Sequence, residues 1–166
     1  TTFYWQYFQT PGVVEAEFAR DWDHSLRAVY YGSGLSLTLK PGRGMVEDAK
    51  IPPRPAWISD AEIAHYVQEF SRTGLRGGIN WYRNIDRNWA LTAPWHDAKI
   101  HQPALFIAGS KDPVITGLIG ERALEVMKDV VPGLREKIII DGAGHWIQQE
   151  RPKEVNDALI GFLKGL

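Results

Sequence analysis

The chain contains no cysteine, and this absence removes several kinds of chemistry. A disulfide framework, a thiolate nucleophile and a cysteine-based zinc site are all excluded. The cellular compartment is left open by this absence, and we expect a cytoplasmic protein.

An excess of one charge is also lacking. The 19 basic and 20 acidic residues give a net charge of -1, and like charges do not form runs. A nucleic-acid binder would show a basic stripe, and a membrane span would need about 18 consecutive apolar residues. We therefore expect neither a nucleic-acid partner nor a membrane span.

The chain does not begin with methionine, and nothing at its start resembles a signal peptide. It opens with the aromatic-dense stretch TTFYWQYFQTPG. Natural domains seldom start so abruptly, so we expect the chain to begin inside a larger protein.

The composition that is present is that of a globular protein. Of the 166 residues, 44% are apolar and 23% are charged, which suffices for one sizeable core. Most aromatic residues precede Pro94, whereas the part after it is aliphatic. This shift predicts two regions, residues 1–93 and residues 94–166.

Periodicity predicts that the first region is mainly helical. Apolar residues at helical spacing predict one helix over residues 12–32, and abundant Gly and Pro predict a loop over residues 33–55. A capping box of Ser59 and Glu62 begins a predicted helix over residues 59–74.

A further helix is predicted over residues 77–92. On that helix one face is expected to carry Tyr82, Ile85 and Trp89.

The second region has a different pattern. Short apolar runs predict strands within residues 102–110 and 135–144, and helical spacing predicts helices over 120–133 and 151–166. Strand, helix, strand, helix indicates a parallel α/β unit. The last helix is expected to turn inward Val155, Leu159, Phe162 and Leu163.

The predicted strands ALFIA and KIII are apolar on both faces, as in the middle of a parallel sheet covered on both sides. Two such strands alone would leave both edges unpaired. No good parallel strand precedes residue 94. We therefore expect further strands from chain outside this sequence.

Two polar residues follow the two strands at the points where they end. Asp112 stands in AGSKDPV and His145 in DGAGHW, so both should project from the carboxyl edge of the sheet, where ligand sites of α/β proteins lie. An acid followed by a histidine is the order found in α/β-hydrolases. The alternatives are ordinary turn chemistry for Asp112 and a locally satisfied loop histidine.

A nucleophile for this couple is missing from the sequence. There is no Gly-x-Ser-x-Gly motif, and YGSGLS has the wrong spacing and no apolar strand ahead of it. We therefore expect the nucleophile, like the missing strands, in an N-terminal half of the same protein that precedes residue 1.

Four segments together resemble the C-terminal half of a soluble-type epoxide hydrolase of the α/β-hydrolase fold. They are YWQYFQTPGVVEAEF, GGINWYRNIDRNW, AGSKDPVI and GAGHWIQQERPKEVN. The resemblance implies a helical cap over residues 1–93 and the last part of the hydrolase core, with an incomplete parallel sheet, over residues 94–166.

The resemblance also implies roles for two tyrosines. Tyr4 resembles the first active-site tyrosine of the cap because it stands five residues before Gln9, with Tyr7 as a competitor that packs inside the cap. Tyr82 in NWYRN resembles the second. Aromatic residues on helical stripes are usually core, which is the alternative for both.

In the second region the resemblance implies that Asp112 is the acid that orients the general base His145. Val114 and Trp146 are expected to line the substrate pocket. The implied nucleophile is an aspartate outside this chain, so the isolated chain is expected to be inactive.

The implied reaction is hydrolysis of a small apolar epoxide by water to a vicinal diol, through an aspartyl ester and without cofactor or metal. Two phenols can donate hydrogen bonds to the oxygen of the opening ring. A haloalkane or haloacetate dehalogenase shares the ester chemistry but would favour Trp or Asn donors. A module that binds lipophilic ligands without turnover is a further alternative.

Overall fold

The computed structural model describes residues 1–32 and 37–166, and for residues 118, 119 and 121 it describes the backbone alone. Residues 33–36 of the predicted loop, and with them most of YGSGLS, lie outside the described residues. The chain divides into two compact units, Thr1–Pro94 and Trp95–Leu166. Their assignment as cap and core stays a prediction.

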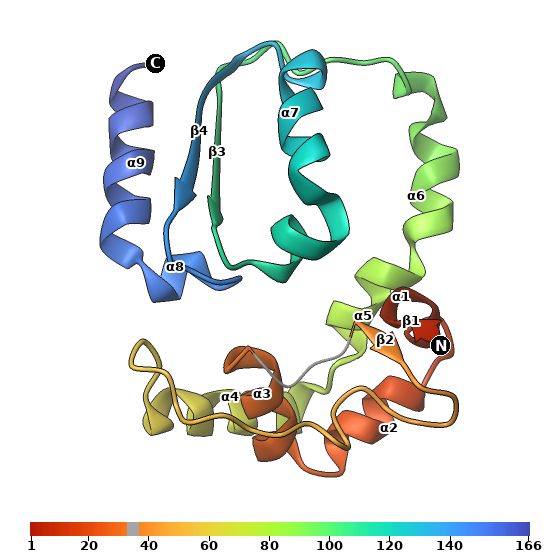
Figure 1. Cartoon of the computed structure of the whole chain (residues 1–166). Helices are drawn as coiled ribbons and strands as arrows, with labels where there is room; N and C mark the ends of the chain where they lie inside the picture. Colours follow the sequence, from red (N-terminus) through yellow and green to blue (C-terminus); the bar gives the residue numbers. More distant parts are fainter. Residues whose placement is uncertain (33–36) are drawn as a thin grey trace. The chain divides into compact units, whose positions relative to one another are not determined.

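The first unit is mainly helical in its described part (Figure 1). Two short strands, β1 and β2, pair in antiparallel fashion. The elements are β1 (Thr2–Phe3), α1 (Tyr4–Tyr7), α2 (Val13–Ala19), α3 (Trp22–Tyr30), β2 (Thr38–Leu39), α4 (Asp60–Thr73), α5 (Arg76–Arg83), α6 (Ile85–Thr92) and the short 3-10 helix η1 (Ala93–Trp95).

The single helix predicted over residues 12–32 is wrong, because the chain forms α2 and α3 there with a break between them. Asp21 has an extended backbone, and its side chain accepts a 3.0 Å hydrogen bond from the backbone N–H of His24. This is the bond of an N-cap, which starts a new helix. Apolar spacing continues through the break and does not register it.

The single helix predicted over residues 77–92 is wrong as well. It ends at Arg83 and restarts at Ile85, and the amide of Asn84 donates to the carbonyl of Asn80 at 2.8 Å. An Asn side chain competes for backbone groups in this way. Trp89 consequently does not share a buried face with Tyr82, and its surface is 74% exposed.

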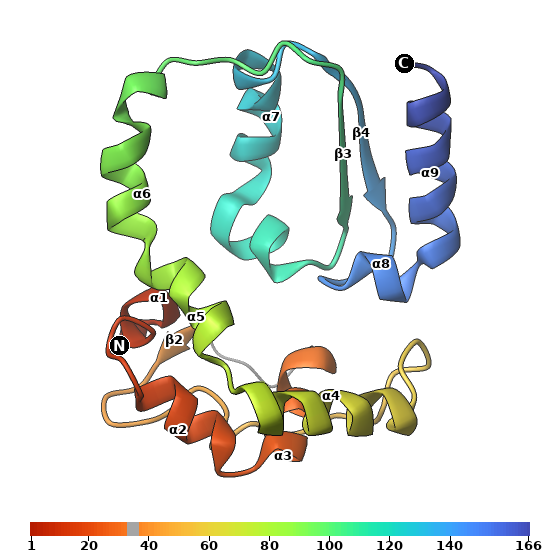
Figure 2. The same ribbon diagram turned by 180° about the vertical axis from the view of Figure 1, so that it is seen from behind.

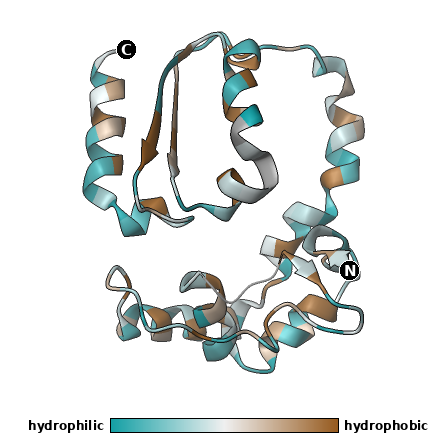
Figure 3. Cartoon of the chain, viewed as in Figure 1, coloured by the Kyte–Doolittle hydropathy of each residue, from teal (hydrophilic) through white to brown (hydrophobic). Residues whose placement is uncertain are grey.

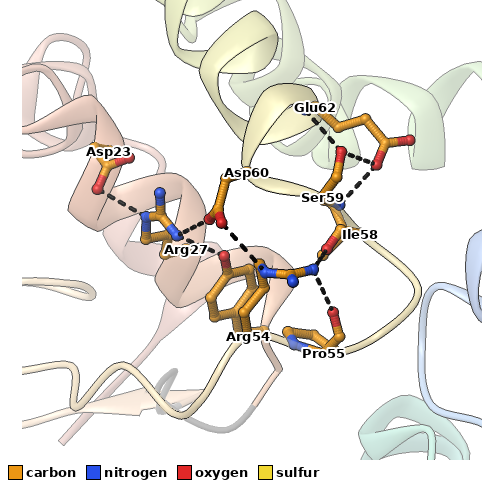
Figure 4. Close-up of polar contacts among 9 residues, drawn as sticks. Asp23, Arg27, Arg54, Pro55, Ile58, Ser59, Asp60 and Glu62 are labelled. Carbon is orange, nitrogen blue, oxygen red and sulfur yellow. Dashed lines mark hydrogen bonds and ion pairs between the residues drawn. The ribbon is translucent and has the colours of Figure 1, made fainter.

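The helix predicted from the capping box is confirmed as α4. Ser59 and Glu62 make the reciprocal bonds of the box, with Glu62 N–H to Ser59 Oγ at 3.2 Å and Ser59 N–H to Glu62 Oε2 at 2.7 Å. Beside it, Arg27 of α3 bonds to Asp23 at 2.8 Å and to Asp60 at 3.2 Å (Figure 4). The bond between Arg27 and Asp60 joins the start of α4 to α3, whereas the one to Asp23 lies within α3.

The core of the first unit contains the two segments singled out by the sequence. Tyr4 and Tyr82 both pack against it. Beside a second buried cluster around Ile58 and Ile63, this core cluster supports the unit, because full burial of a side chain such as Val, Ile or Phe stabilises a fold by about 1.5–3 kcal/mol. Its buried members are Phe8, Val14, Phe18, Ala28, Val46 and Ile79.

The second unit contains the predicted parallel α/β arrangement. β3 and β4 pair in parallel, with Gly109 opposite Ile140, and α7 and α9 lie on opposite sides of this pair in both views (Figures 1 and 2). The elements are β3 (Ala104–Gly109), the π-helical segment η2 (Val114–Ile119), α7 (Gly120–Val130), β4 (Leu134–Ile140), α8 (Ile147–Glu150) and α9 (Pro152–Lys164).

The described part of this sheet has two strands. A sheet of this width is too narrow to cover the apolar faces of the helices beside it. Of the residues expected to face inward from α9, Val155 is buried, but Leu159 and Leu163 are 43% and 61% exposed. On β4, whose arrowhead end is brown and thus strongly hydrophobic in Figure 3, Ile139 is 39% exposed. The inward placement of Leu159 and Leu163 is therefore wrong for this chain.

A bilayer-crossing helix is not found among the described residues, since none of their helices combines the necessary length and apolar character.

Candidate active site

The loops that follow β3 and β4 are joined by hydrogen bonds. The backbone N–H of Lys111 donates to the carbonyl of Ala143 at 2.8 Å, and the N–H of Gly142 donates to Ser110 Oγ at 2.8 Å. The same hydroxyl donates to Asp141 Oδ1 at 3.2 Å. Two loops that begin at the same edge of the sheet are thereby held in one arrangement.

Gly109 makes the close approach of these loops possible. A Cβ atom at this position would lie 2.3 Å from each of two carbonyl oxygens, those of Ala143 and Gly144. Because both atoms belong to the backbone, a side chain could fit only if the loop moved away. The glycine at the end of β3 is therefore a requirement of the loop that carries His145.

Asp112 and His145 meet at this edge, as predicted from their places after the two strands. The Nδ1 atom of His145 lies 3.0 Å from Asp112 Oδ2 and 3.1 Å from Oδ1. The backbone N–H of Val114 also donates to Oδ1 at 2.8 Å, so the carboxylate is held from two sides. Asp112 is 8% exposed, whereas the side chain of His145 is 48% exposed.

This geometry sets what the histidine can do. When Nδ1 carries the proton and donates it to the carboxylate, Nε2 is the basic nitrogen. A carboxylate so placed also stabilises the imidazolium that forms when Nε2 takes up a proton. The pair is thus suited to general-base chemistry on a small molecule such as water.

Val114 and Trp146, the expected pocket residues, flank the couple. Val114 is in contact through its backbone N–H, as above, and the ring of Trp146 stands edge-on to the His145 ring at 5.1 Å between centroids. Both residues are half-buried. Their role in lining a substrate pocket stays a prediction.

In the first unit, Tyr4 and Tyr82 lie together. Their ring centroids are 5.7 Å apart, and both rings contact Phe8, at 5.4 Å and 4.9 Å. Burial, together with the neighbouring Tyr4, raises the pKa of Tyr82 above the ordinary tyrosine value. Its hydroxyl therefore stays protonated, and able to donate, throughout the neutral and mildly alkaline range.

Tyr7, the competitor of Tyr4, is engaged inside its own unit. Its hydroxyl donates to Glu17 Oε2 at 2.7 Å, and burial and this carboxylate raise its pKa far above the ordinary value. Glu17 is itself buried and accepts a 2.7 Å bond from the N–H of Val46. Tyr7 is therefore a partner of a buried carboxylate, which agrees with a packing role.

Three residues for which the sequence predicted no role in the site tie the two tyrosine segments together. Arg83 donates to both carboxylate oxygens of Glu15, at 2.6 and 3.0 Å, and to the carbonyl of Phe8 at 2.9 Å. The amide of Gln9 donates to the carbonyl of Tyr82 at 3.1 Å. All three lie inside two of the segments that resemble epoxide hydrolases, YWQYFQTPGVVEAEF and GGINWYRNIDRNW. Membership of these segments is the one sequence feature that points to them.

The site residues thus form two pairs, Tyr4 with Tyr82 and Asp112 with His145, one in each unit. That the two pairs share one cavity stays a prediction. Within the described ranges no cluster of three His, Asp or Glu side chains is arranged to hold a metal ion, and the expectation of a reaction without metal or cofactor also stays a prediction.

Residues 6–158 match the model of the alpha/beta hydrolase family, and the chain belongs to that family. This confirms the predicted fold class, the C-terminal part of an α/β-hydrolase fold. Among named relatives, the chain is 46% identical to epoxide hydrolase A of Mycobacterium tuberculosis, across 99% of this chain and 52% of that protein.

Other relatives carry the same activity in their names. The chain is 34% identical to epoxide hydrolase 2 of Siraitia grosvenorii, over 98% of this chain and 52% of that protein. The crystal structure of epoxide hydrolase A from Mycobacterium thermoresistibile superimposes with a TM-score of 0.88 at 44% identity, over 99% of this chain and 52% of that one. The chain therefore spans about half the length of these relatives.

Proposed function

We propose that the protein containing this chain hydrolyses epoxides to vicinal diols. The observation that carries the proposal is the pair of phenols, Tyr4 and Tyr82, with ring centroids 5.7 Å apart, in a chain that also pairs Asp112 with His145. An epoxide oxygen is a poor leaving group unless it receives a hydrogen bond or a proton. Two protonated phenols are suited to give both.

In the first step a carboxylate opens the ring. One of its oxygens attacks a ring carbon and forms an ester bond, while the bond between that carbon and the epoxide oxygen breaks. The electron pair of the broken bond goes to the oxygen, which takes a proton from one phenol and a hydrogen bond from the other. The raised pKa of Tyr82 keeps it protonated until this moment.

In the second step water cleaves the ester. His145 Nε2 removes a proton from water, whose oxygen attacks the ester carbonyl carbon, and the diol leaves with the oxygen that the carboxylate donated. Water supplies two protons in this step: the one held by His145 passes to the diol oxygen as it leaves, and the second, lost when the new carboxyl group becomes a carboxylate, returns to the phenolate. The sum of both steps is therefore epoxide plus water to diol. Asp112 orients the imidazole and stabilises its charged form.

The nucleophile is proposed to be an aspartate in the N-terminal half of the same protein. That half is also the proposed partner of the second unit, because further strands would cover apolar side chains such as Ile139 and Leu163, which are 39% and 61% exposed. Aromatic residues near the phenols favour an apolar epoxide, with Val114 and Trp146 at its pocket. A cytoplasmic location is part of the same proposal.

The test uses the full-length protein with an aryl epoxide, an aliphatic epoxide and a chloroalkane. We expect diol from the epoxides and no chloride from the chloroalkane. A single turnover in H₂¹⁸O should give unlabelled diol, because its new oxygen comes from the protein carboxylate, and the label should enter the protein.

Chloride release without diol would make the protein a dehalogenase, and binding of an epoxide without turnover would make it a binding module. Label in the diol after one turnover would mean that water attacks the ring directly. The isolated chain of 166 residues is expected to be inactive, since it lacks the nucleophile.

A further inference from the structure

Glu150 lies five residues after His145 and reaches back to the loop that carries it. Its Oε2 atom accepts the backbone N–H of Gly144 at 2.6 Å, and its Oε1 atom accepts the N–H of Trp146 at 2.9 Å. These are the two residues on either side of His145. One carboxylate therefore holds the backbone before and after the proposed base.

The backbone of α8 closes this arrangement. The N–H of Glu150 donates to the carbonyl of Trp146 at 2.8 Å, so Trp146 and Glu150 are bonded through both backbone and side chain. Hydrogen bonds from N–H groups to a carboxylate are roughly twice as strong as those between neutral groups. They fix a loop whose two glycines, Gly142 and Gly144, would otherwise leave it conformationally free.

Gly144 has a specific reason to be glycine here. A Cβ atom at this position would lie 2.9 Å and 3.2 Å from the two carboxylate oxygens of Glu150. The space that a side chain would fill is occupied by the carboxylate. A change at either Gly144 or Glu150 should therefore disturb the same two hydrogen bonds, those from the N–H groups of Gly144 and Trp146 to the Glu150 carboxylate.

We propose that Glu150 is a positioning residue for His145, acting through the N–H groups of Gly144 and Trp146. The Asp112 carboxylate fixes the imidazole from the side of Nδ1, and Glu150 fixes the backbone from which the imidazole projects. The part of this inference that concerns rate rests on the proposed function. The part that concerns the His145–Asp112 hydrogen bond does not.

The chain offers matched variants. Glu150→Gln keeps the shape and one acceptor oxygen, but turns an NH₂ group towards a backbone N–H. Gly144→Ala keeps the Glu150 carboxylate but pushes it away from the loop, because the added methyl group would occupy its space. Glu154→Gln is the control, because Glu154 is a half-exposed glutamate of the neighbouring α9 whose nearest cation, on Arg151, is 3.9 Å away.

The experiment uses the full-length protein and separates the two chemical steps. A displacement of about 1 Å at a catalytic group can lower a rate roughly 10²-fold. We therefore expect Glu150→Gln and Gly144→Ala to slow ester hydrolysis by roughly 10- to 100-fold while ester formation changes less than about twofold. Glu154→Gln should leave both rates at the parent value.

The second readout needs no substrate. In the proton NMR spectrum, the Nδ1 proton that His145 shares with Asp112 should give a downfield signal in the parent and in Glu154→Gln, and a weakened or absent signal in Glu150→Gln. A parent-like signal and a parent-like hydrolysis rate in Glu150→Gln would overturn the inference. So would equal loss of both chemical steps with the signal intact.

These outcomes are distinguishable from a failure of the proposed function. If the parent turned over no epoxide, the proposed function would fail, yet the NMR signal would still decide whether Glu150 holds His145. If Glu150→Gln unfolded, Gly144→Ala would test the same two bonds with the carboxylate retained.

Discussion

Arg83 and Glu15 form a two-point ion pair between α5 and α2, with N–O distances of 2.6 and 3.0 Å. Their side chains are only 14% and 20% exposed. The same guanidinium donates to the carbonyl of Phe8, whose ring touches those of Tyr4 and Tyr82. Arg83 and Glu15 therefore hold α5, which carries Tyr82, against the segment that contains Tyr4 and Phe8.

Arg83→Lys should destabilise the first unit and slow ring opening together. A lysine ammonium cannot bridge both carboxylate oxygens and the carbonyl in the fixed geometry of a guanidinium. The expected loss of unfolding free energy is about 1.5–3 kcal/mol, the range for hydrogen bonds to charged groups. Urea denaturation of the full-length protein measures it, with Arg87→Lys on the exposed part of α6 as control. Equal stability of the two variants would contradict the role of Arg83.

The stability that Glu15 contributes should depend on pH. Arg83, as its hydrogen-bond partner, lowers the pKa of the Glu15 carboxyl below the ordinary glutamate value. A carboxyl with a depressed folded-state pKa stabilises the fold above the unfolded-state pKa of about 4.3, and this contribution is lost as the pH falls through the folded-state value. The stability difference between the parent and Glu15→Gln should therefore be largest near pH 7 and shrink below about pH 4. Denaturation at several pH values measures this difference, and a gap that widened on acidification would contradict the assignment.

Substitutions of Tyr4, Tyr7 and Tyr82 should differ in their effect on the rate of ring opening. Tyr4→Phe and Tyr82→Phe each remove a donor to the developing alkoxide, which costs roughly 10²–10³-fold in the rate of ring opening. Tyr7→Phe instead removes a donor to buried Glu17, so it should lower stability and leave the ring-opening rate near the parent value. Stopped-flow measurement of ester formation compares the three variants.

The rate of ring opening in the parent should also depend on pH. Because the pKa of Tyr82 is raised, this rate should begin to fall only above about pH 10, the ordinary tyrosine value.

Sequence patterns were sufficient where the signal is local and repeated. The apolar runs of β3 and β4 predicted parallel strands, and the order of Asp112 and His145 after them predicted that the two side chains meet. The capping box of Ser59 likewise located the start of α4. In each case the residue types themselves require the structure, because a buried parallel strand must be apolar and an N-cap must accept a hydrogen bond.

Patterns failed where one side chain decides between alternatives. The breaks at Asp21 and Asn84 depend on single side-chain bonds to the backbone, which apolar spacing does not register. Tyr4 and Tyr7 were told apart only by the family resemblance, because the bond from Tyr7 to Glu17, ten residues further on, leaves no mark in the apolar spacing. The exposure of Leu163 depends on the width of the sheet, which no residue within α9 encodes.

His145→Gln in the full-length protein should separate formation of the ester from its hydrolysis. Without a general base the second step should slow by roughly 10²–10⁴-fold, and the ester should accumulate. Intact-protein mass spectrometry after mixing with an epoxide would then show one added substrate mass. Asp112→Asn should have a related effect, on the order of 10⁴-fold in turnover, because an amide no longer holds the imidazole in the required tautomer. Turnover by His145→Gln at the parent rate would exclude His145 as the base.

Gly109→Ala should disturb the same site without touching a catalytic side chain. The added Cβ would meet the carbonyl oxygens of Ala143 and Gly144 at 2.3 Å, and neither atom can rotate away. The loop that carries His145 must move or the strand pair must separate. We therefore expect the free energy of unfolding to fall by about 1–3 kcal/mol, as for an overpacked core.

Gly161→Ala is the matched control. Gly161 lies on α9, and a Cβ atom added there would meet no atom within 4 Å. Alanine also stabilises a helix by about 0.5–1 kcal/mol relative to glycine. Gly109→Ala should lower both the thermal unfolding temperature and the rate of ester hydrolysis. Gly161→Ala should lower neither. If the two variants behaved alike, the close contact between the loops would not be what holds His145 beside Asp112.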